Sequence, residues 1–122
     1  MKIKESAENY LETILILQNK NGSVRSIDIA NELNYSKASV SVAMKQLREN
    51  NYITIDKDGS ILFTESGKAN AERIFERHSI ITELLINMGV SPEIATEDAC
   101  RIEHVISEES FSAIKKYMSG LD

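Results

Sequence analysis

A chain of 122 residues can hold one domain with a real core, or two small modules that share a helix, but it leaves no room for a large enzyme fold. Hydrophobic residues make up 42% and charged residues 27%, as in ordinary globular proteins, and no apolar run approaches the ~18 residues of a membrane span. The net charge of -5 lies wholly in residues 61–122, which carry eleven acidic and six basic side chains. Because the N-terminal half is neutral, charge alone does not assign it to nucleic acid.

The compartment and the fold class follow from a few residue types. The first five residues lead into an amphipathic pattern without an apolar leader, and the one cysteine cannot form an internal disulfide. Both features favour a reducing cytoplasm with no membrane partner. A single proline and five glycines favour long helices with few breaks, so we expect a mostly α protein.

Residues 5–20 are predicted to form the first helix, because apolar side chains recur there at three- and four-residue spacing. Glu12 lies beside the apolar stripe, together with Asn9. A carboxylate in that position is typical of a solvated flank, but it could also reach a ligand held by another helix. The apolar positions are Ala7, Tyr10, Leu11, Ile14 and Leu17.

Two short helices are predicted next, over 26–33 and 37–50, with Ser26 as the expected N-cap of the first. Because a brief turn joins them and small Ala30 stands where they must approach, they predict a helix-turn-helix. A plain helical hairpin is the alternative. The expected buried residues are Ile27, Ala30 and Leu33 in the first helix and Val40, Met44 and Leu47 in the second.

The outward face of the second helix combines small hydroxyls with cations, which suit contacts to phosphates and base edges in a major groove. A β-hairpin is predicted directly after it, with strands over 52–55 and 61–64 and Lys57 in the turn. A hairpin in that position is the wing of a winged helix, and it favours DNA binding over the plain hairpin. The outward residues are Lys37, Ser39, Ser41, Val42, Lys45 and Arg48.

Three helices are predicted after the hairpin. Thr64 caps a long one over 65–88, Ser91 and Pro92 start one over 92–106, and Ser107 starts the last, over 108–118. Their apolar surface exceeds what a wing can cover, so we expect a homodimer interface. The inward positions of the long helix are Ala69, Ile74, His78, Ile81 and Leu85.

Cys100, Glu103 and His104 fall at i, i+3 and i+4 of the predicted helix over 92–106. That spacing places a thiol, a carboxylate and an imidazole on one helix face, where they could bind a metal ion together. The alternative is an ordinary amphipathic helix with a buried cysteine and a partly buried histidine.

Several segments, in chain order and spanning nearly the whole chain, carry a resemblance to a known family. They are Glu8–Ile14, Val24–Ala30, Ser36–Ser41, Leu62–Gly67, Glu76–His78 and Glu97–Ser107. The chain resembles the diphtheria-toxin-repressor family, the iron- or manganese-dependent transcriptional repressors of bacteria and archaea. The resemblance implies a winged helix-turn-helix DNA-binding domain over 1–65 and a helical metal-binding and dimerisation domain over 66–122, in the short form without an SH3-like third domain.

The resemblance also implies the metal ligands. Asn9 aligns with a further ligand position, but the family usually carries Met or Asp there, and an amide offers only a carbonyl oxygen. Thr82 and Thr96 replace a Glu and a His of the iron-type repressors, so a second site of that type is altered or missing. The matching ligands are Glu12, His78, Cys100, Glu103 and His104.

The donor types bear on the metal. Thiolate with imidazole favours Fe²⁺, Co²⁺, Ni²⁺ or Zn²⁺ over Mn²⁺. By resemblance Fe²⁺ is the expected signal, and Mn²⁺ is the alternative because Asn9, Glu12 and Glu103 are hard donors. Because the thiol must be deprotonated and the imidazoles neutral, affinity should fall as pH drops.

The expected function is repression of metal-uptake genes by a metal-loaded homodimer on a palindromic operator, with no small-molecule substrate. One alternative is a winged-helix regulator that ignores metal. Another is a small metalloenzyme, although a general base and a substrate pocket are not evident. A helical interaction module without DNA contact is the third. The candidate DNA contacts are Arg25, Ser36, Lys37, Ser39, Ser41, Lys45 and Lys57.

Overall fold

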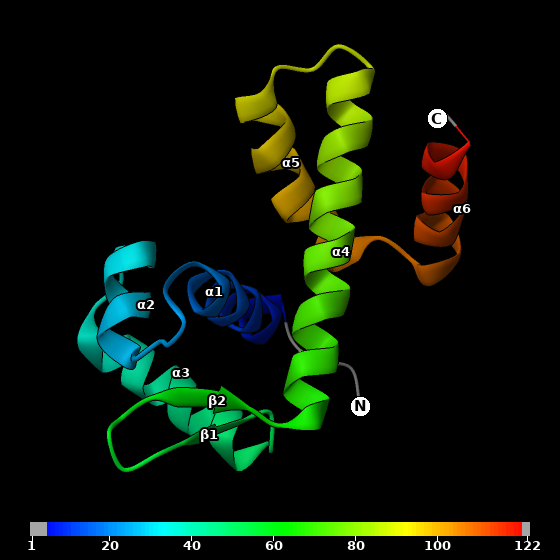
Figure 1. The fold of residues 1–122 in the computed structure, drawn as a ribbon. Helices are drawn as coiled ribbons and strands as arrows, with labels where there is room; N and C mark the ends of the chain where they lie inside the picture. The colour runs from blue at the N-terminus through cyan, green and yellow to red at the C-terminus, as the bar shows by residue number, and fades with distance from the viewer. Residues whose placement is uncertain (1–4, 121–122) are drawn as a thin grey trace. The chain divides into compact units, whose positions relative to one another are not determined.

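The computed structural model describes residues 5–120 and is mostly α with one hairpin, as expected (Figure 1). Residues 1–4, which belong to the N-terminal stretch predicted to lack an apolar leader, and residues 121–122 lie outside the described part. The chain divides into two compact units. The first ends at Glu72 and the second begins at Arg73, so the boundary lies within one helix. The elements are α1 (Glu5–Asn21), α2 (Ser26–Leu33), α3 (Lys37–Glu49), β1 (Ile53–Ile55), β2 (Ile61–Phe63), α4 (Glu65–Asn87), α5 (Pro92–Val105) and α6 (Glu108–Ser119).

The first unit packs α1, α2 and α3 around an aliphatic core. Leu11 and Ile14 of α1 are fully buried, and α3 buries the three positions predicted for it. Residues at i, i+4 and i+7 share one face of a helix, so this periodicity was sufficient to find the inner side of α3. The α3 residues concerned are Val40, Met44 and Leu47.

The start of α2 differs from the prediction in two ways. Its N-cap is Arg25 rather than Ser26, because the carboxylate of Asp28 accepts a hydrogen bond from the backbone N of Arg25 at 2.9 Å. Its buried face contains Ile29, whereas Ile27 is exposed. An Asp at the third helical position can therefore move a cap by one residue when it bonds back to the backbone.

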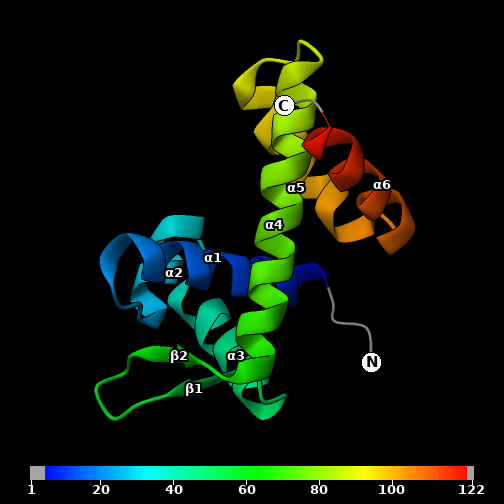
Figure 2. The same cartoon turned by 45° about the vertical axis from the view of Figure 1, so that its right-hand side comes forward.

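The wing is an antiparallel hairpin in which Ile53 pairs with Phe63 and Ile55 with Ile61. Ile53 and Ile61 are buried while Leu62 is exposed, which is the alternation of a half-covered sheet. The backbone N of Ile61 also donates to Val24 O at 2.8 Å, so the segment before α2 lies along the hairpin edge (Figure 2).

The turn of the wing is closed by Asp56, whose Oδ1 accepts hydrogen bonds from the backbone N of Asp58 and of Ser60, each at 2.9 Å. Gly59 has φ +83°, a conformation that glycine adopts without strain. The wing is therefore held by its own side chains, with Lys57 exposed within the turn.

The join between the hairpin and α4 is tight. Thr64 caps α4 as predicted, since its Oγ1 accepts a hydrogen bond from Gly67 N at 3.0 Å. A Cβ at position 67 would collide with the backbone carbonyl oxygen of Tyr52, so only glycine fits. Ala71 is the buried alanine of this part of α4, and Ala69, predicted to point inward, is exposed.

Tyr10 of α1 and Tyr35, in the turn between α2 and α3, meet edge to face with ring centroids 6.1 Å apart. Burial raises the pKa of the Tyr10 phenol above its ordinary 10.0, and the neighbouring Tyr35 adds to that shift. The contact joins α1 to the helix-turn-helix.

The second unit consists of the rest of α4 with α5 and α6 (Figure 1). Ile81, Ala99 and Phe111, one from each helix, form its buried apolar cluster. Pro92 stands in the first turn of α5, and Ser107 caps α6 by accepting a hydrogen bond from Ser110 N at 3.1 Å, both as predicted. No helix within residues 5–120 has the length and apolar character needed to cross a bilayer.

Candidate metal centre and nucleic-acid interface

The candidate DNA contacts lie on the exposed side of the first unit. Ser36 is the N-cap of α3, and its Oγ accepts a hydrogen bond from Ser39 N at 3.1 Å. The Ser36 hydroxyl also donates to the Ser39 Oγ at 2.9 Å, so both hydroxyls stabilise the start of the helix. The structure places on exposed positions all seven candidates, namely Arg25, Ser36, Lys37, Ser39, Ser41, Lys45 and Lys57.

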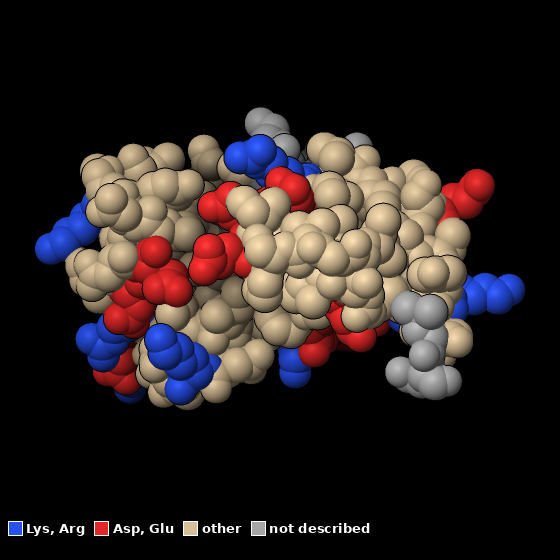
Figure 3. Space-filling view, turned by 90° about the horizontal axis from the view of Figure 1, so that it is seen from above, with Lys and Arg blue, Asp and Glu red and all other residues tan. Residues whose placement is uncertain are grey.

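One face of the molecule shows how its surface charge is distributed. On the face drawn in Figure 3, Asp and Glu side chains alternate with Lys and Arg in small groups, and neutral atoms cover most of the view. That face carries no single-sign field of the kind that attracts DNA by charge alone. The cations predicted to contact DNA are Arg25 at the N-cap of α2, Lys37 and Lys45 on α3, and Lys57 in the wing.

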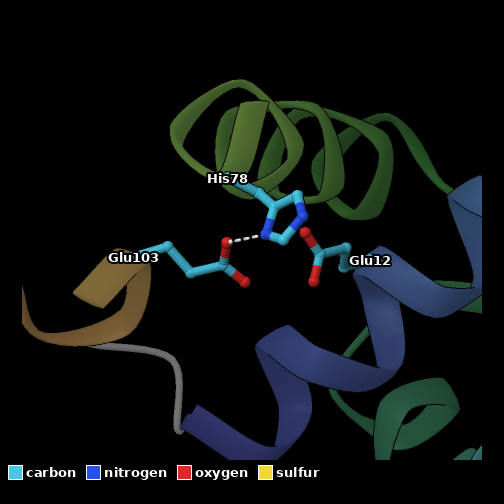
Figure 4. Close-up of side chains that lie close together, drawn as sticks. All are labelled: Glu12, His78 and Glu103. Carbon is cyan, nitrogen blue, oxygen red and sulfur yellow. Dashed lines mark hydrogen bonds and ion pairs between the residues drawn. The ribbon is translucent and has the colours of Figure 1, made fainter. Parts of the chain in front are cut away.

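His78 of α4 and Glu103 of α5 contact each other inside the second unit (Figure 4). Nδ1 of His78 lies 2.9 Å from Oε2 of Glu103, a hydrogen bond when Nδ1 carries the proton. Glu103 is 0% exposed, and both side chains are among the described groups that could hold a metal ion. A buried carboxylate is costly unless it is paired or binds a cation.

His104 brings a second imidazole to the same carboxylate. Its Nε2 lies 3.4 Å from Oε1 of Glu103, and its side chain is 3% exposed. Oε1 accepts no hydrogen bond from the residues that the structure describes, so it retains lone pairs. Two imidazoles and a buried carboxylate are a donor set that divalent transition metals take, and the residues present therefore fit a metal ion.

Three further second-unit positions named in the sequence analysis lie on α4 and α5. Cys100 is partly buried and stands one turn before His104 in α5. Thr96 donates its hydroxyl hydrogen to Pro92 O at 2.8 Å, within its own helix. The Thr82 hydroxyl is buried and makes no hydrogen bond to any residue from 5 to 120.

The candidate metal ligands of the first unit lie on α1. Glu12, also drawn in Figure 4, is a buried carboxylate, and Asn9 is partly exposed one turn before it. The backbone O of Asn9 accepts a hydrogen bond from the Thr13 hydroxyl at 2.9 Å. Two acidic groups, Glu8 and Glu12, are thus buried on a helix whose sequence pattern would leave them at the surface.

Arg77 is the residue that the sequence pattern missed. It is 6% exposed, and its guanidinium binds backbone carbonyls at the end of α5 and the Glu108 carboxylate. An arginine in an amphipathic helix is expected at the surface, so only its place beside His78 could have drawn attention to it.

Comparison with known proteins defines the class and then the family. A model described as the iron dependent repressor N-terminal DNA binding domain matches residues 2–61. Another, described as the iron dependent repressor metal binding and dimerisation domain, matches residues 64–122. The winged-helix fold is thereby placed among DNA-binding regulators.

Individual relatives agree. The chain is 33% identical over 114 residues to the transcriptional regulator MntR of Escherichia coli, covering 93% of this chain and 74% of that one. It is 30% identical over 118 residues to an HTH-type transcriptional regulator of Methanocaldococcus jannaschii, covering 95% and 94%. The structure of T. acidophilum IdeR matches with a TM-score of 0.80 at 26% identity, covering 98% of this chain and 55% of that one.

The chain belongs to the iron-dependent repressor family of metal-dependent transcriptional regulators, which are not enzymes. The resemblance found in the sequence is confirmed.

Proposed function

We propose that this protein represses transcription as a homodimer that binds palindromic operator DNA when it is loaded with a divalent metal ion, in a reducing cytoplasm. The observation that carries the proposal is the buried Glu103 carboxylate between His78 and His104. In a family of metal-dependent regulators, such a cluster in a chain that also carries a winged-helix unit is best explained as a sensor.

The proposed ligands come from both units. The second unit contributes His78, Glu103 and His104, with the Cys100 thiolate in the same α5 turns, and the first contributes Glu12. The Asn9 amide offers at most a carbonyl oxygen, where Met or Asp is usual. Binding of the metal ion would neutralise the negative charge of the buried carboxylates, because the metal supplies a cation.

Fe²⁺ is the proposed signal and Mn²⁺ the alternative. A thiolate and imidazoles are softer donors than carboxylates, and they favour Fe²⁺, Co²⁺, Ni²⁺ or Zn²⁺ over Mn²⁺. The description of the family as iron dependent supports this order. Genes for metal uptake are the proposed targets, because a repressor that is loaded by a metal would then reduce the uptake of that same metal.

In the proposed mechanism, the bound metal ion links the two units. When Glu12 and the second-unit ligands bind one ion, the first unit becomes fixed to the helices of the dimerisation unit. The two α3 helices of a dimer would then hold the spacing of half-sites one DNA turn apart, about 34 Å. By linkage, operator DNA must raise metal affinity by the same factor that metal raises DNA affinity, typically about 1–3 kcal/mol.

The test is fluorescence anisotropy of a labelled duplex, selected from a random-sequence pool in the presence of Fe²⁺ under anaerobic conditions. Titration with Fe²⁺, Mn²⁺ and Zn²⁺ should show metal-stimulated binding, with Fe²⁺ acting at the lowest concentration. DNA binding that is equally strong in a chelator would overturn the proposal in favour of a metal-independent regulator. If the duplex leaves the metal-binding isotherm unchanged, metal binding and DNA binding are not coupled, and the proposed link between the two units is wrong.

A further inference from the structure

Arg77 lies on α4 directly before His78, and its side chain reaches the C-terminal end of α5. Nη1 donates hydrogen bonds to the backbone O of Glu103 at 3.2 Å and to that of Ile106 at 2.9 Å. Nη2 donates to Oε2 of Glu108 at 2.7 Å. One guanidinium therefore joins α4 to the last turn of α5 and to the first residue of α6.

The carbonyls that Arg77 reaches need a partner. The last four C=O groups of a helix have no intrahelical donor and form the negative end of its dipole. At the end of α5 the Ile102 carbonyl is bonded by Ile106 N at 3.0 Å, and the Glu103 carbonyl is bonded by Arg77. A cation with a planar fork of donors suits this position, so Arg77 acts as the C-terminal cap of α5.

Two further contacts fix the guanidinium in place. Its central carbon lies 5.3 Å from the centroid of the Phe111 ring, within the range of a cation–π interaction. Phe111 is itself buried in the apolar cluster of the second unit. The Glu108 carboxylate, in the first turn of α6, balances the charge. The orientation of Arg77 is thus determined by α6 as well as by α4.

Glu103 is consequently held at both of its ends by consecutive residues of α4. Arg77 binds its backbone carbonyl, and His78 contacts its carboxylate at 2.9 Å. His104 lies in the same last turn of α5 and contacts the other carboxylate oxygen. Because a helical backbone is stiff, a shift of the carbonyl would move both side chains.

We propose that Arg77 is a positioning residue of the metal centre: by capping α5 it fixes the Glu103 carboxylate and the His104 imidazole against His78. Its effect on metal affinity rests on the proposed function. Its effect on the contact between His78 and Glu103 does not, because that contact joins two side chains of the protein itself.

The test uses the full chain with Arg77→Met and Arg77→Lys. Arg77→Met keeps a long side chain but removes every donor, whereas Arg77→Lys keeps the charge and loses the fork. The matched control is Glu76→Gln, next to Arg77, which breaks the exposed ion pair of Glu76 with Lys115 at 2.9 Å. That pair also joins α4 to α6 but touches neither α5 nor its carbonyls.

The first reading is the imidazole ¹⁵N spectrum of the metal-free protein at one fixed pH. In the wild type, the proton of His78 should reside on Nδ1, bonded to Glu103. In Arg77→Met, that signal should give way to a mixture of tautomers while far-UV circular dichroism stays helical. Arg77→Lys should keep part of the Nδ1 signal, and Glu76→Gln should match the wild type.

The second reading is the affinity for Co²⁺, followed by its absorption spectrum. Loss of a group that orients a ligand typically costs about 10–100-fold in metal affinity, so we expect a loss of that size in Arg77→Met. A smaller loss is expected in Arg77→Lys, and none in Glu76→Gln. Altered absorption bands in the arginine variants would report changed ligand geometry, which a general loss of stability would not produce.

A folded Arg77→Met protein with wild-type tautomers and wild-type Co²⁺ affinity would overturn the inference. If Arg77→Met does not fold, the same two readings on Arg77→Lys decide the matter. If the wild type binds no Co²⁺, Mn²⁺ or Fe²⁺, the proposed function fails, and the imidazole spectrum alone still decides whether Arg77 positions Glu103.

Discussion

The two units differ in how large an apolar core accompanies their buried charged groups. The first fills most of its interior with aliphatic residues from every one of its elements, among them Leu11, Val40 and Ile53, and its buried acidic groups, Glu8 and Glu12, lie on α1. The second buries a small apolar cluster and, with it, the ionic groups of Arg77 and Glu103. Apolar packing is stable in itself, whereas buried ions depend on their partners. We therefore expect the first unit to act as the fixed platform and the second to be the unit that responds to a bound ion.

Both units expose large apolar side chains, but to different degrees. The two most exposed that the structure describes belong to the second unit, with Met88 71% and Val105 74% exposed, against 57% for Val42 of the first. Buried polar networks with an open apolar surface make stability depend on what binds. The following variants break or sharpen the comparison, from the largest expected effect to the smallest.

Gly67→Val should damage the fixed platform most. The new side chain would collide with the Tyr52 carbonyl, and overpacking against backbone costs about 3 kcal/mol or more. Urea unfolding followed by circular dichroism measures the loss. Gly120→Ala is the control, because its Cβ would meet Tyr117 O at 3.5 Å and Lys116 O at 3.8 Å, both ordinary contacts. Equal stability of the two variants would contradict the tight join.

Glu103→Gln should abolish the response of the second unit. It keeps the shape of the side chain but removes the charge, and we expect at least about 100-fold weaker binding of Co²⁺ or Mn²⁺, beyond what loss of an orienting group costs. Isothermal titration measures the affinity, with exposed Glu109→Gln as control. Unchanged affinity would place the metal elsewhere.

Glu12→Ala tests whether the platform is coupled to the responsive unit. Metal-stimulated DNA binding should disappear, a loss of about 1–3 kcal/mol of coupling, while metal-free DNA binding stays unchanged. Anisotropy with the selected duplex, with and without Fe²⁺, measures both. A variant that keeps the full metal response would remove Glu12 from the ligand set.

Cys100→Asp should alter selectivity more than overall affinity. A carboxylate in place of the thiolate favours harder ions, so the ratio of Co²⁺ to Mn²⁺ affinity should fall. Competition between the two ions, followed by the electron paramagnetic resonance of free Mn²⁺, gives that ratio. If the ratio does not change, the thiolate is not a ligand.

Lys45→Ala should have the smallest effect and should be confined to DNA. Loss of one phosphate contact lowers the salt slope of binding by about 1 and weakens all sequences alike. Anisotropy over a range of KCl concentrations measures the slope. Lys116→Ala, exposed on α6 of the other unit, is the control and should leave the slope unchanged.

The sequence predicted much of the fold, because each element carried its own signal. The periodicity of α3 and the caps Thr64 and Ser107 are local features, and the structure agrees with them. The prediction failed where local pattern did not distinguish two similar residues. Ala69 was predicted to point inward, but Ala71 of the same helix is the buried alanine. The N-cap of α2 is Arg25 instead of the predicted Ser26, because the Asp28 carboxylate accepts a hydrogen bond from the backbone N of Arg25.

The site was less accessible to local reasoning. His78 and Glu103 are 25 residues apart, and spacing within a single helix cannot show that they meet. The family resemblance supplied that pairing. Arg77 lies within one of the matched segments, but two of its partners are backbone carbonyls and the third, Glu108, is 31 residues away, so the sequence pattern did not reveal its role.

The edge-to-face pair of Tyr10 and Tyr35 gives the first unit an optical reporter of its own. The chain has no tryptophan, so its near-ultraviolet signal comes largely from four tyrosines. Because the pKa of Tyr10 is raised, its phenol stays neutral when phenols of ordinary pKa ionise in alkali. Folding that favours the neutral phenol loses this stabilisation as pH rises through the raised pKa. A late phenolate absorbance would therefore report that Tyr10 is still packed against Tyr35, and its return to the ordinary pH would report that this contact is lost.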